Sequence, residues 1–208
     1  MSWKDRERGY HHGNLRQALI EAARALIGEK GPAGFTFAEA ARAAGVSAAA
    51  PYRHFRDRDA LMADVAAQGF ERFEAALAKA WNEGKPEPMI AFHHLGRAYL
   101  HFARTEHAYY SAMFESGLSP DATPELRAAS DRAFGVLRGA AETLCAQLPA
   151  GKRPPVLMVS LHIWAISHGV ASLFGRGDSG RRKLPMDADE LLESAVLVYL
   201  NGLGLGRA

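Results

Sequence analysis

Apolar residues recur along most of the chain at intervals of three and four positions, which is the period of helices that bury one face. No stretch alternates between apolar and polar residues as a half-exposed strand would. Helix start and stop signals divide the pattern into nine helices without a sheet. These helices begin near residues 14, 36, 47, 57, 89, 106, 123, 156 and 187. The pattern therefore predicts an all-α fold.

Capping residues support several of these boundaries. Thr36 and Glu39 have the spacing of a capping box, as do Asp187 and Glu190, in which each side chain accepts a hydrogen bond from the other residue's backbone amide. Thr123 precedes Pro124 and Glu125, an order that suits the first turn of a helix. We therefore expect helices to begin at these three sites.

The segment Thr36–Phe55 predicts two short helices joined by a tight turn. Ala41 is small enough for the helices to approach closely, Gly45 suits the corner, and Ser47 can begin the second helix. Pro51 disfavours helical geometry at the preceding residue, but its missing amide falls within the first turn, so we expect the second helix to survive. This is the pattern of a helix-turn-helix, although two packed helices without nucleic acid would give it too.

Length and charge divide the chain into modules. The 208 residues suffice for one large or two small domains. Residues 1–58 hold ten Lys/Arg and six Asp/Glu, whereas residues 59–208 hold fifteen and seventeen, so a basic head precedes a slightly acidic body. We predict a flexible basic arm (1–12), a helix-turn-helix domain (13–58), a connecting helix (59–84) and a larger body (85–208). The arm is either a solvated tail or a segment that follows DNA.

Four segments of the head carry motifs that are specific in combination: Tyr10–Arg16, Gly45–Ser47, Tyr52–Phe55 and Asp57–Leu61. Together they resemble the DNA-binding domain of the TetR/AcrR transcriptional regulators. The resemblance covers about residues 10–75 and departs from the family pattern at Ala40 and Pro51. In the body, Trp164 with His168-Gly169 is similar to the Trp-His-Gly signature of one subgroup's C-terminal domain.

The resemblance implies a homodimer that binds a palindromic operator in double-stranded DNA and responds to a ligand in its body. It makes residues 85–208 the ligand-binding and dimerisation domain. It places Ser47, Ala48 and Ala49 at base edges and Arg53 at a guanine edge or a phosphate. Alanine can contact a thymine methyl group but cannot form a bidentate hydrogen bond, so these positions favour modest base specificity. The residues at the family's phosphate-anchoring positions are Thr36, Tyr52, His54 and Arg58.

The body contains a dense aromatic region that is either an effector pocket or plain core. Few charges accompany the rings, so a pocket here would suit an apolar or aromatic small molecule. A metal site is not expected, because the histidines show no clear pair on one helical face with a carboxylate partner. The candidate pocket residues are Phe92, Tyr99, Phe102, Tyr110, Met113, Phe114, Trp164 and His168.

The segment Pro154–Gly175 carries no charge, a pattern typical of a membrane span or of a helix in a subunit interface. Its histidines and serines would be costly in lipid, so we favour an interface shared with the last helix, in a four-helix contact between two chains. The candidate interface residues are Ile163, Val170, Phe174, Leu192, Val196 and Tyr199.

The combined interpretation is a ligand-responsive transcriptional repressor. We expect no enzymatic activity and no cofactor, because no paired carboxylate, metal cluster or nucleophile-base pair can be assigned. The single cysteine, Cys145, and the polar N-terminus indicate a cytoplasmic protein. A constitutive DNA binder without an effector, and a helical small-molecule carrier or enzyme, are the alternatives.

Overall fold

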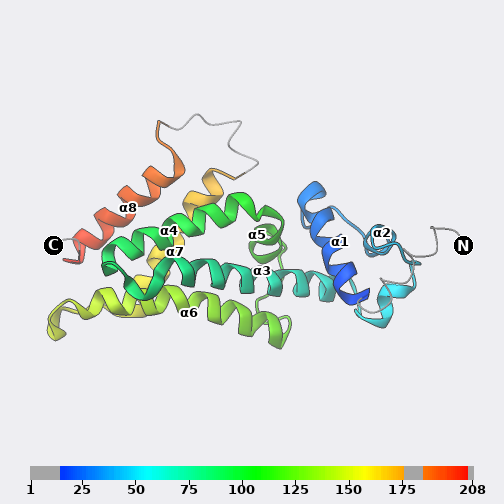
Figure 1. Ribbon diagram of the computed structural model, residues 1–208, viewed down its shortest axis with the longest axis horizontal. Helices are drawn as coiled ribbons and strands as arrows, with labels where there is room; N and C mark the ends of the chain where they lie inside the picture. The colour runs from blue at the N-terminus through cyan, green and yellow to red at the C-terminus, as the bar shows by residue number, and fades with distance from the viewer. Residues whose placement is uncertain (1–14, 176–184, 206–208) are drawn as a thin grey trace, which may run out of the picture. The chain divides into compact units, whose positions relative to one another are not determined.

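The computed structural model describes residues 15–175 and 185–205, and within these ranges it contains helices and no β-strand. The expectation of an all-α fold is confirmed. Eight of the nine predicted helices are α-helices, and the one predicted near residue 47 is the 3-10 helix η2. The predicted arm (1–12) lies outside the described residues. The α-helices (Figure 1) are α1 (Leu15–Lys30), α2 (Phe37–Ala43), α3 (Arg58–Trp81), α4 (Pro88–Thr105), α5 (His107–Phe114), α6 (Pro124–Ala146), α7 (Val156–Leu173) and α8 (Ala188–Gly202). The short 3-10 helices are η2 (Ala50–Arg53), η3 (Asn82–Gly84) and η4 (Ala150–Lys152).

Local capping fixes three of these helix starts as predicted. The Thr36 and Asp187 side chains accept hydrogen bonds from the amides of Glu39 and Glu190, and both glutamates return the bond. The hydroxyl oxygen of Thr123 accepts from the amide of Leu126 at 3.1 Å. Each such cap stabilises its helix by about 1 kcal/mol.

The described residues form two compact units, of which the first contains residues 15–70 together with His107–Ala129. In this unit α5 packs against α1, where the Arg24 guanidinium lies 5.7 Å from the centre of the Tyr109 ring. Arg16 of α1 forms an ion pair of 2.5 Å with Asp64 of α3. Burial raises the pKa of Asp64, against the opposing effect of the Arg16 charge.

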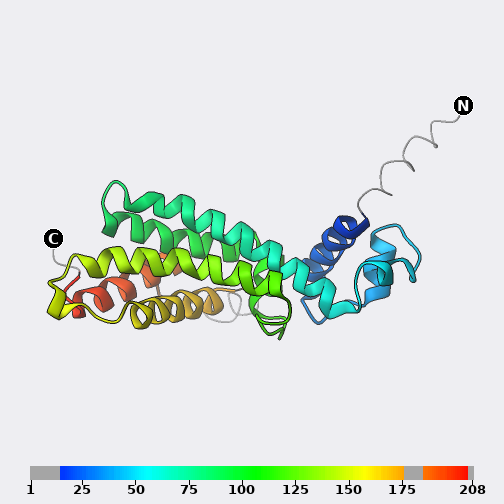
Figure 2. The same cartoon turned by 90° about the horizontal axis from the view of Figure 1, so that it is seen from below.

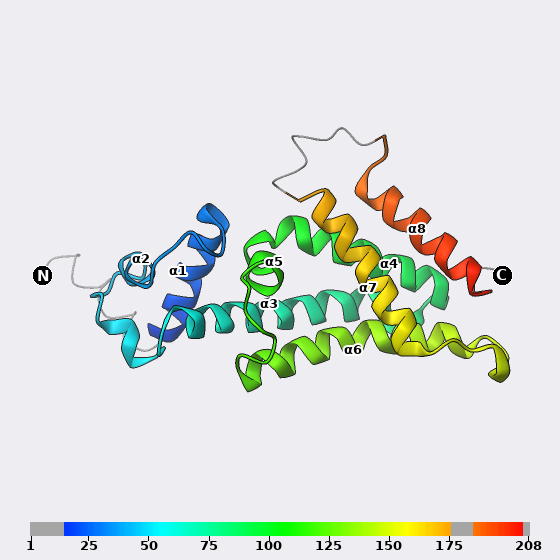
Figure 3. The same ribbon diagram turned by 180° about the vertical axis from the view of Figure 1, so that it is seen from behind.

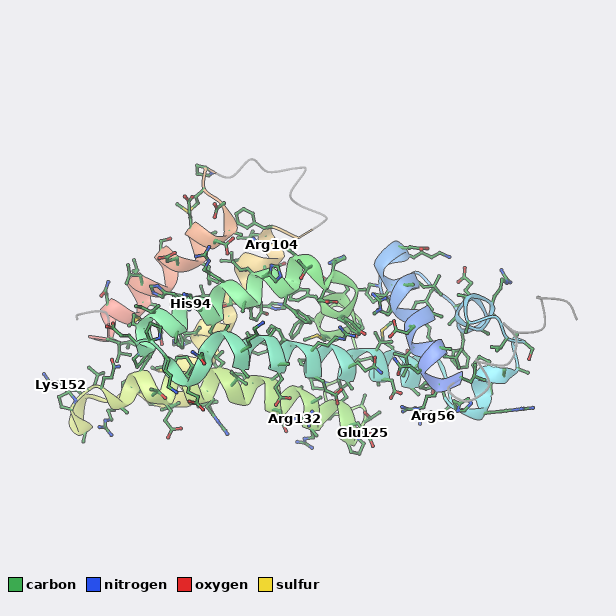
Figure 4. The ribbon with its side chains drawn as sticks, in the orientation of Figure 1. Arg56, His94, Arg104, Glu125, Arg132 and Lys152 are labelled. Carbon is green, nitrogen blue, oxygen red and sulfur yellow. The ribbon has the colours of Figure 1, made fainter. Side chains whose placement is uncertain are left out.

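The second unit contains Glu71–Glu106 and the residues from Ser130 onward. The last turns of α3 and the helix α4 form an antiparallel hairpin through η3 (Figure 2). The helices α7 and α8 pack against each other and against α4 (Figure 3). Arg132 of α6 (Figure 4) pairs with Glu74 of α3 at 3.0 Å. The predicted domain boundaries divide the chain by function instead of by packing and stay a proposal.

Candidate functional site

The helix-turn-helix begins with α2 and its capping box. Glu39 accepts hydrogen bonds from the backbone amide and the hydroxyl of Thr36, at 2.8 and 2.9 Å, and from the Lys30 ammonium at 2.8 Å. These bonds, with Lys30 first, lower the pKa of Glu39 to about 2. Both donors of Thr36 are therefore engaged by a carboxylate. This arrangement gives Thr36 a capping role in the described structure.

The turn after α2 depends on Gly45. Its φ of +74° lies in the left-handed region, which glycine adopts without the steric cost that other residues incur. This conformation lets the amide of Val46 donate to the carbonyl of Ala41 at 3.0 Å. Ala41 is fully buried, in agreement with its predicted place at the close approach of two helices.

The predicted second helix is shorter than expected because of Pro51. An α-helix beginning at Ser47 would need an amide at Pro51 to reach the Ser47 carbonyl, and proline has none. The carbonyl instead accepts from the amide of Ala50 at 3.0 Å, which is the bond of a 3-10 helix. The predicted start at Ser47 is therefore wrong, and η2 begins three residues later.

The shortened helix leaves an exposed polar and basic segment on the surface. The side chain of Tyr52 is 64% exposed, while its ring rests edge-on against Phe37 with 5.0 Å between ring centres. Six of the eight residues predicted to contact DNA are exposed and lie within eight consecutive positions, in which Pro51 is buried. These six are Ser47, Ala48, Ala49, Tyr52, Arg53 and His54.

Arg58, a seventh predicted contact, is engaged within the protein. Its guanidinium donates to the carbonyl of Phe35 at 3.0 Å and to the carbonyl of Pro32. It also lies over the Phe35 ring, 4.6 Å from the centre, within the range of a cation–π contact. Arg58 therefore ties the start of α3 to the loop between α1 and α2, a role that the sequence pattern did not indicate.

The residues of the predicted effector pocket are divided between the two units. Phe92, Tyr99 and Phe102 are buried in the second unit, where the Tyr99 hydroxyl lies 3.0 Å from Nδ1 of His168. Trp164, also in this unit, is 38% exposed. The remaining three, Tyr110, Met113 and Phe114, belong to the first unit.

Within each unit the aromatic residues pack closely. The Phe73 ring centre lies 5.1 Å from that of Tyr99 and 4.9 Å from that of Phe102. In the first unit, the centres of Tyr110 and Phe114 are 4.9 Å apart. These distances are those of packed aromatic pairs, so the rings contribute to the cores of the two units. Among the described residues, no group of three or more His, Cys, Asp or Glu residues could hold a metal ion.

The predicted interface residues are corrected in part by their burial. Ile163, Val170, Leu192 and Val196 are buried within the single chain, so they are not available to a second copy. Only Phe174 and Tyr199 keep intermediate exposure. The reason is that α7 is apolar on every side, so its inward face could not be distinguished from its outward face by sequence. The exposed large apolar side chains of α7 and α8 are Leu157, Met158, Leu161, Trp164, Leu173, Leu197 and Val198.

The helix α7 is the one helix of the described residues whose length and apolar composition would allow a membrane span. A third of it is buried inside the protein, with Ile163 and Val170 facing the core. A helix whose core-facing side packs in this way also fits the body of a globular protein.

The sequence matches known families over both parts of the chain. Residues 19–65 match the family described as bacterial regulatory proteins, tetR family. Residues 92–199 match the family described as tetracyclin repressor-like, C-terminal domain, which spans more than half of the chain. The chain belongs to the TetR family. It is thus a transcriptional regulator with a DNA-binding domain, and the head that carries Tyr52 and Arg53 is that domain.

Solved structures share the TetR fold over nearly the whole chain. A protein of unknown function from Rhodococcus sp. RHA1 is 31% identical, with 93% of this chain and 97% of that chain covered and a TM-score of 0.75. The TetR family transcriptional regulator PfmR from Thermus thermophilus is 22% identical, with 88% and 97% covered and a TM-score of 0.65. The ketosteroid transcriptional regulator KstR2 of Mycobacterium tuberculosis is 18% identical, with 90% and 93% covered and a TM-score of 0.61. No curated protein matches the chain.

Proposed function

We propose that this TetR family member is a cytoplasmic, ligand-responsive repressor that binds a palindromic operator as a homodimer. The observation that carries the proposal is the exposed segment 47–54, which follows a capped helix and the left-handed turn at Gly45. A segment of this kind can enter the major groove, where its side chains meet base edges. Trp164 and His168-Gly169 further support membership of the subgroup with a Trp-His-Gly body.

Within this segment the residues divide into two classes of DNA contact. Ser47, Ala48 and Ala49 have short side chains that suit close contacts with thymine methyl groups at the base edges. Arg53 is the long cation that can reach a guanine edge, and Tyr52 and His54 are placed to contact phosphates. Thr36 and Arg58 act through the protein, by capping α2 and by holding the loop before it.

The exposed apolar side chains of α7 and α8 support dimerisation through these two helices. Leu161 is 43% exposed and Val198 is 72% exposed, and apolar side chains exposed together on neighbouring helices mark interaction sites in soluble proteins. Covering this surface with the same helices of a second copy gives a four-helix contact with twofold symmetry.

The effector is an apolar or aromatic small molecule that binds beside the aromatic side chains of the body. The pair of Tyr99 and His168, 3.0 Å apart, offers a polar group among rings that would orient such a ligand. The close packing of Phe73 against Tyr99 and Phe102 favours the second candidate function, a constitutive DNA binder without an effector. A thermal-shift screen of apolar ligands separates the two, since an effector raises the melting temperature and a filled core leaves it unchanged.

Footprinting on the DNA upstream of the protein's own gene and its neighbours tests DNA recognition. We expect a protected palindrome with half-sites about 10 base pairs, or a multiple of this, apart. Binding should weaken steeply as the salt concentration rises, because phosphate contacts release counterions. Absence of protection at every salt concentration would refute operator binding.

A further inference from the structure

A groove of about 800 Å³ lies between α3 and α4 in the second unit. Its volume falls within the range of about 300–1,000 Å³ that small-molecule sites occupy. Part of its lining is apolar and consists of four alanines and a phenylalanine, Ala75, Ala76, Ala80, Ala98 and Phe102. The groove is therefore wide enough for a ligand and partly apolar.

The polar lining of the groove is cationic. Arg72, Lys79 and Lys85 face a single carboxylate, that of Glu106, so the lining has a formal charge of +2. Residues 59–208 as a whole have a net charge of −2, so the lining of this groove has the opposite sign to the net charge of the body. A cleft lined by one sign of charge concentrates ligands of the opposite sign.

The charges are unevenly available along the groove. Lys79 has no ion pair within the part of the chain that the structure describes, whereas Lys85 pairs with Glu83 at 2.7 Å. His94, on α4 (Figure 4), also lines the groove. Because η3 joins α3 to the antiparallel α4, Lys79, Lys85 and His94 lie toward the connected end of the hairpin.

The opposite end of the groove carries Arg72 and the carboxylate of Glu106, whose charges offset each other. Arg72 and Lys79 are seven residues apart on α3, which is about 10 Å along the helix axis. Ala75 and Ala76 line the groove between these levels on α3, and Ala98 and Phe102 line it from α4. An anionic group is thus favoured at one end, with about two helical turns of apolar lining beyond it.

We infer that this groove binds a small amphipathic organic anion. A carboxylate or phosphate head lies at Lys79 and His94, beside the ion pair of Lys85 with Glu83, and an apolar tail extends over Ala98 and Phe102. A ligand with this pairing of head and tail satisfies the cations and covers the apolar lining at once, which a nucleic-acid backbone or a neutral hydrocarbon would not do. This site depends neither on DNA binding nor on an effector in the aromatic region.

Titration calorimetry of the full chain with sodium octanoate, octyl phosphate and 1-octanol tests the inference. At least one of the two anions should bind about tenfold or more tightly than the alcohol, because the alcohol lacks the charge that Lys79 attracts. The stronger of the two identifies the head group. Binding of the anion should weaken as salt is added, since exposed charges are screened.

Three variants locate the binding. Lys79→Glu should lower the affinity for the anion by about tenfold or more through charge reversal. Ala98→Trp should abolish binding by filling the groove. The matched control is Lys152→Glu, which reverses an exposed charge on η4 outside the groove (Figure 4). If Ala98→Trp does not fold by circular dichroism, Ala76→Leu replaces it.

Binding of 1-octanol as tight as that of octanoate and of octyl phosphate would overturn the inference. So would equal losses of affinity in Lys79→Glu and Lys152→Glu, or the absence of binding heat from both anions at millimolar concentration. A selective loss in Lys79→Glu and in the filled variant, with Lys152→Glu unchanged, supports it.

Discussion

Replacing Arg58 by alanine tests whether this residue holds the head together or contacts DNA. The substitution removes charge-assisted hydrogen bonds to the carbonyls of Phe35 and Pro32 and a cation–π contact with the Phe35 ring. Hydrogen bonds to charged groups contribute about 1.5–3 kcal/mol each, and an exposed cation–π contact about 0.5–1 kcal/mol. Water partly replaces the lost donors because the Arg58 side chain is 30% exposed.

We therefore expect Arg58→Ala to lower the free energy of unfolding by about 3 kcal/mol, less than the sum of its contacts. For a chain of this length, that loss corresponds to a decrease in the melting temperature of roughly 6–12 °C. Urea unfolding followed by circular dichroism measures the first quantity and a thermal scan the second. Arg58→Lys should keep most of the loss, because one ammonium group cannot reach both carbonyls and stack on the ring.

The same variants distinguish structural support from a phosphate contact. Loss of one phosphate contact changes the slope of log K against log salt by about 0.9, whereas loss of a structural bond lowers affinity without changing the slope. The control is Arg56→Ala, since Arg56 is exposed and pairs only with its neighbour Asp57 in the described residues. An Arg58→Ala protein that melts like wild type, or an Arg58→Lys protein with full stability, would refute the structural role.

Three further outcomes are expected. Leu161→Asp should reduce the mass measured by light scattering from two chains to one, whereas Ile163→Ala should cost about 2–4 kcal/mol of stability and leave the dimer intact; a Leu161→Asp dimer would place the interface elsewhere. The pKa of the Glu39 carboxyl is lowered from 4.5 to about 2, so this group stabilises α2 fully above pH 4.5 and progressively less as the pH falls toward 2. Glu39→Gln should therefore make the urea concentration at the unfolding midpoint less dependent on pH across this range. An unchanged pH dependence of this midpoint would contradict the capping role of Glu39. Tyr52→Ala should lower the affinity for all DNA sequences equally, while Arg53→Ala should also change base preference by about 1–3 kcal/mol. If Arg53→Ala also lowers the affinity for all sequences equally, Arg53 contacts a phosphate.

The parts of the fold that sequence predicted are those governed by neighbours a few positions apart. The capping pairs Thr36–Glu39 and Asp187–Glu190 form as expected, and Gly45 adopts the left-handed conformation at the turn. These interactions span three residues or fewer, so they depend little on the remainder of the chain. Pro51 belongs to the same class, but its effect was underestimated, because its missing amide changes the helix type and delays the helix start.

The candidate site was predicted less completely. The exposure of segment 47–54 agrees with its predicted role, since polar and small residues follow a tight turn there. The engagement of Arg58 could not be foreseen, because its acceptors are the carbonyls of residues 23 and 26 positions earlier. The groove between α3 and α4 was missed for the same reason, since its lining residues come from both helices of a hairpin and from the connection between them.

The amino-acid sequence by itself determined the helical class, the helix boundaries with local caps, the tight turn and the exposed segment that follows it. Tertiary structure alone decided which face of α7 is inward, so that Ile163 and Val170 became core while Leu161 and Trp164 stayed exposed. The physical reason is that a helix with apolar residues on all sides has no preferred face until other helices cover one of them. Local hydrogen bonds are encoded within a few residues, whereas burial is a property of the packed chain.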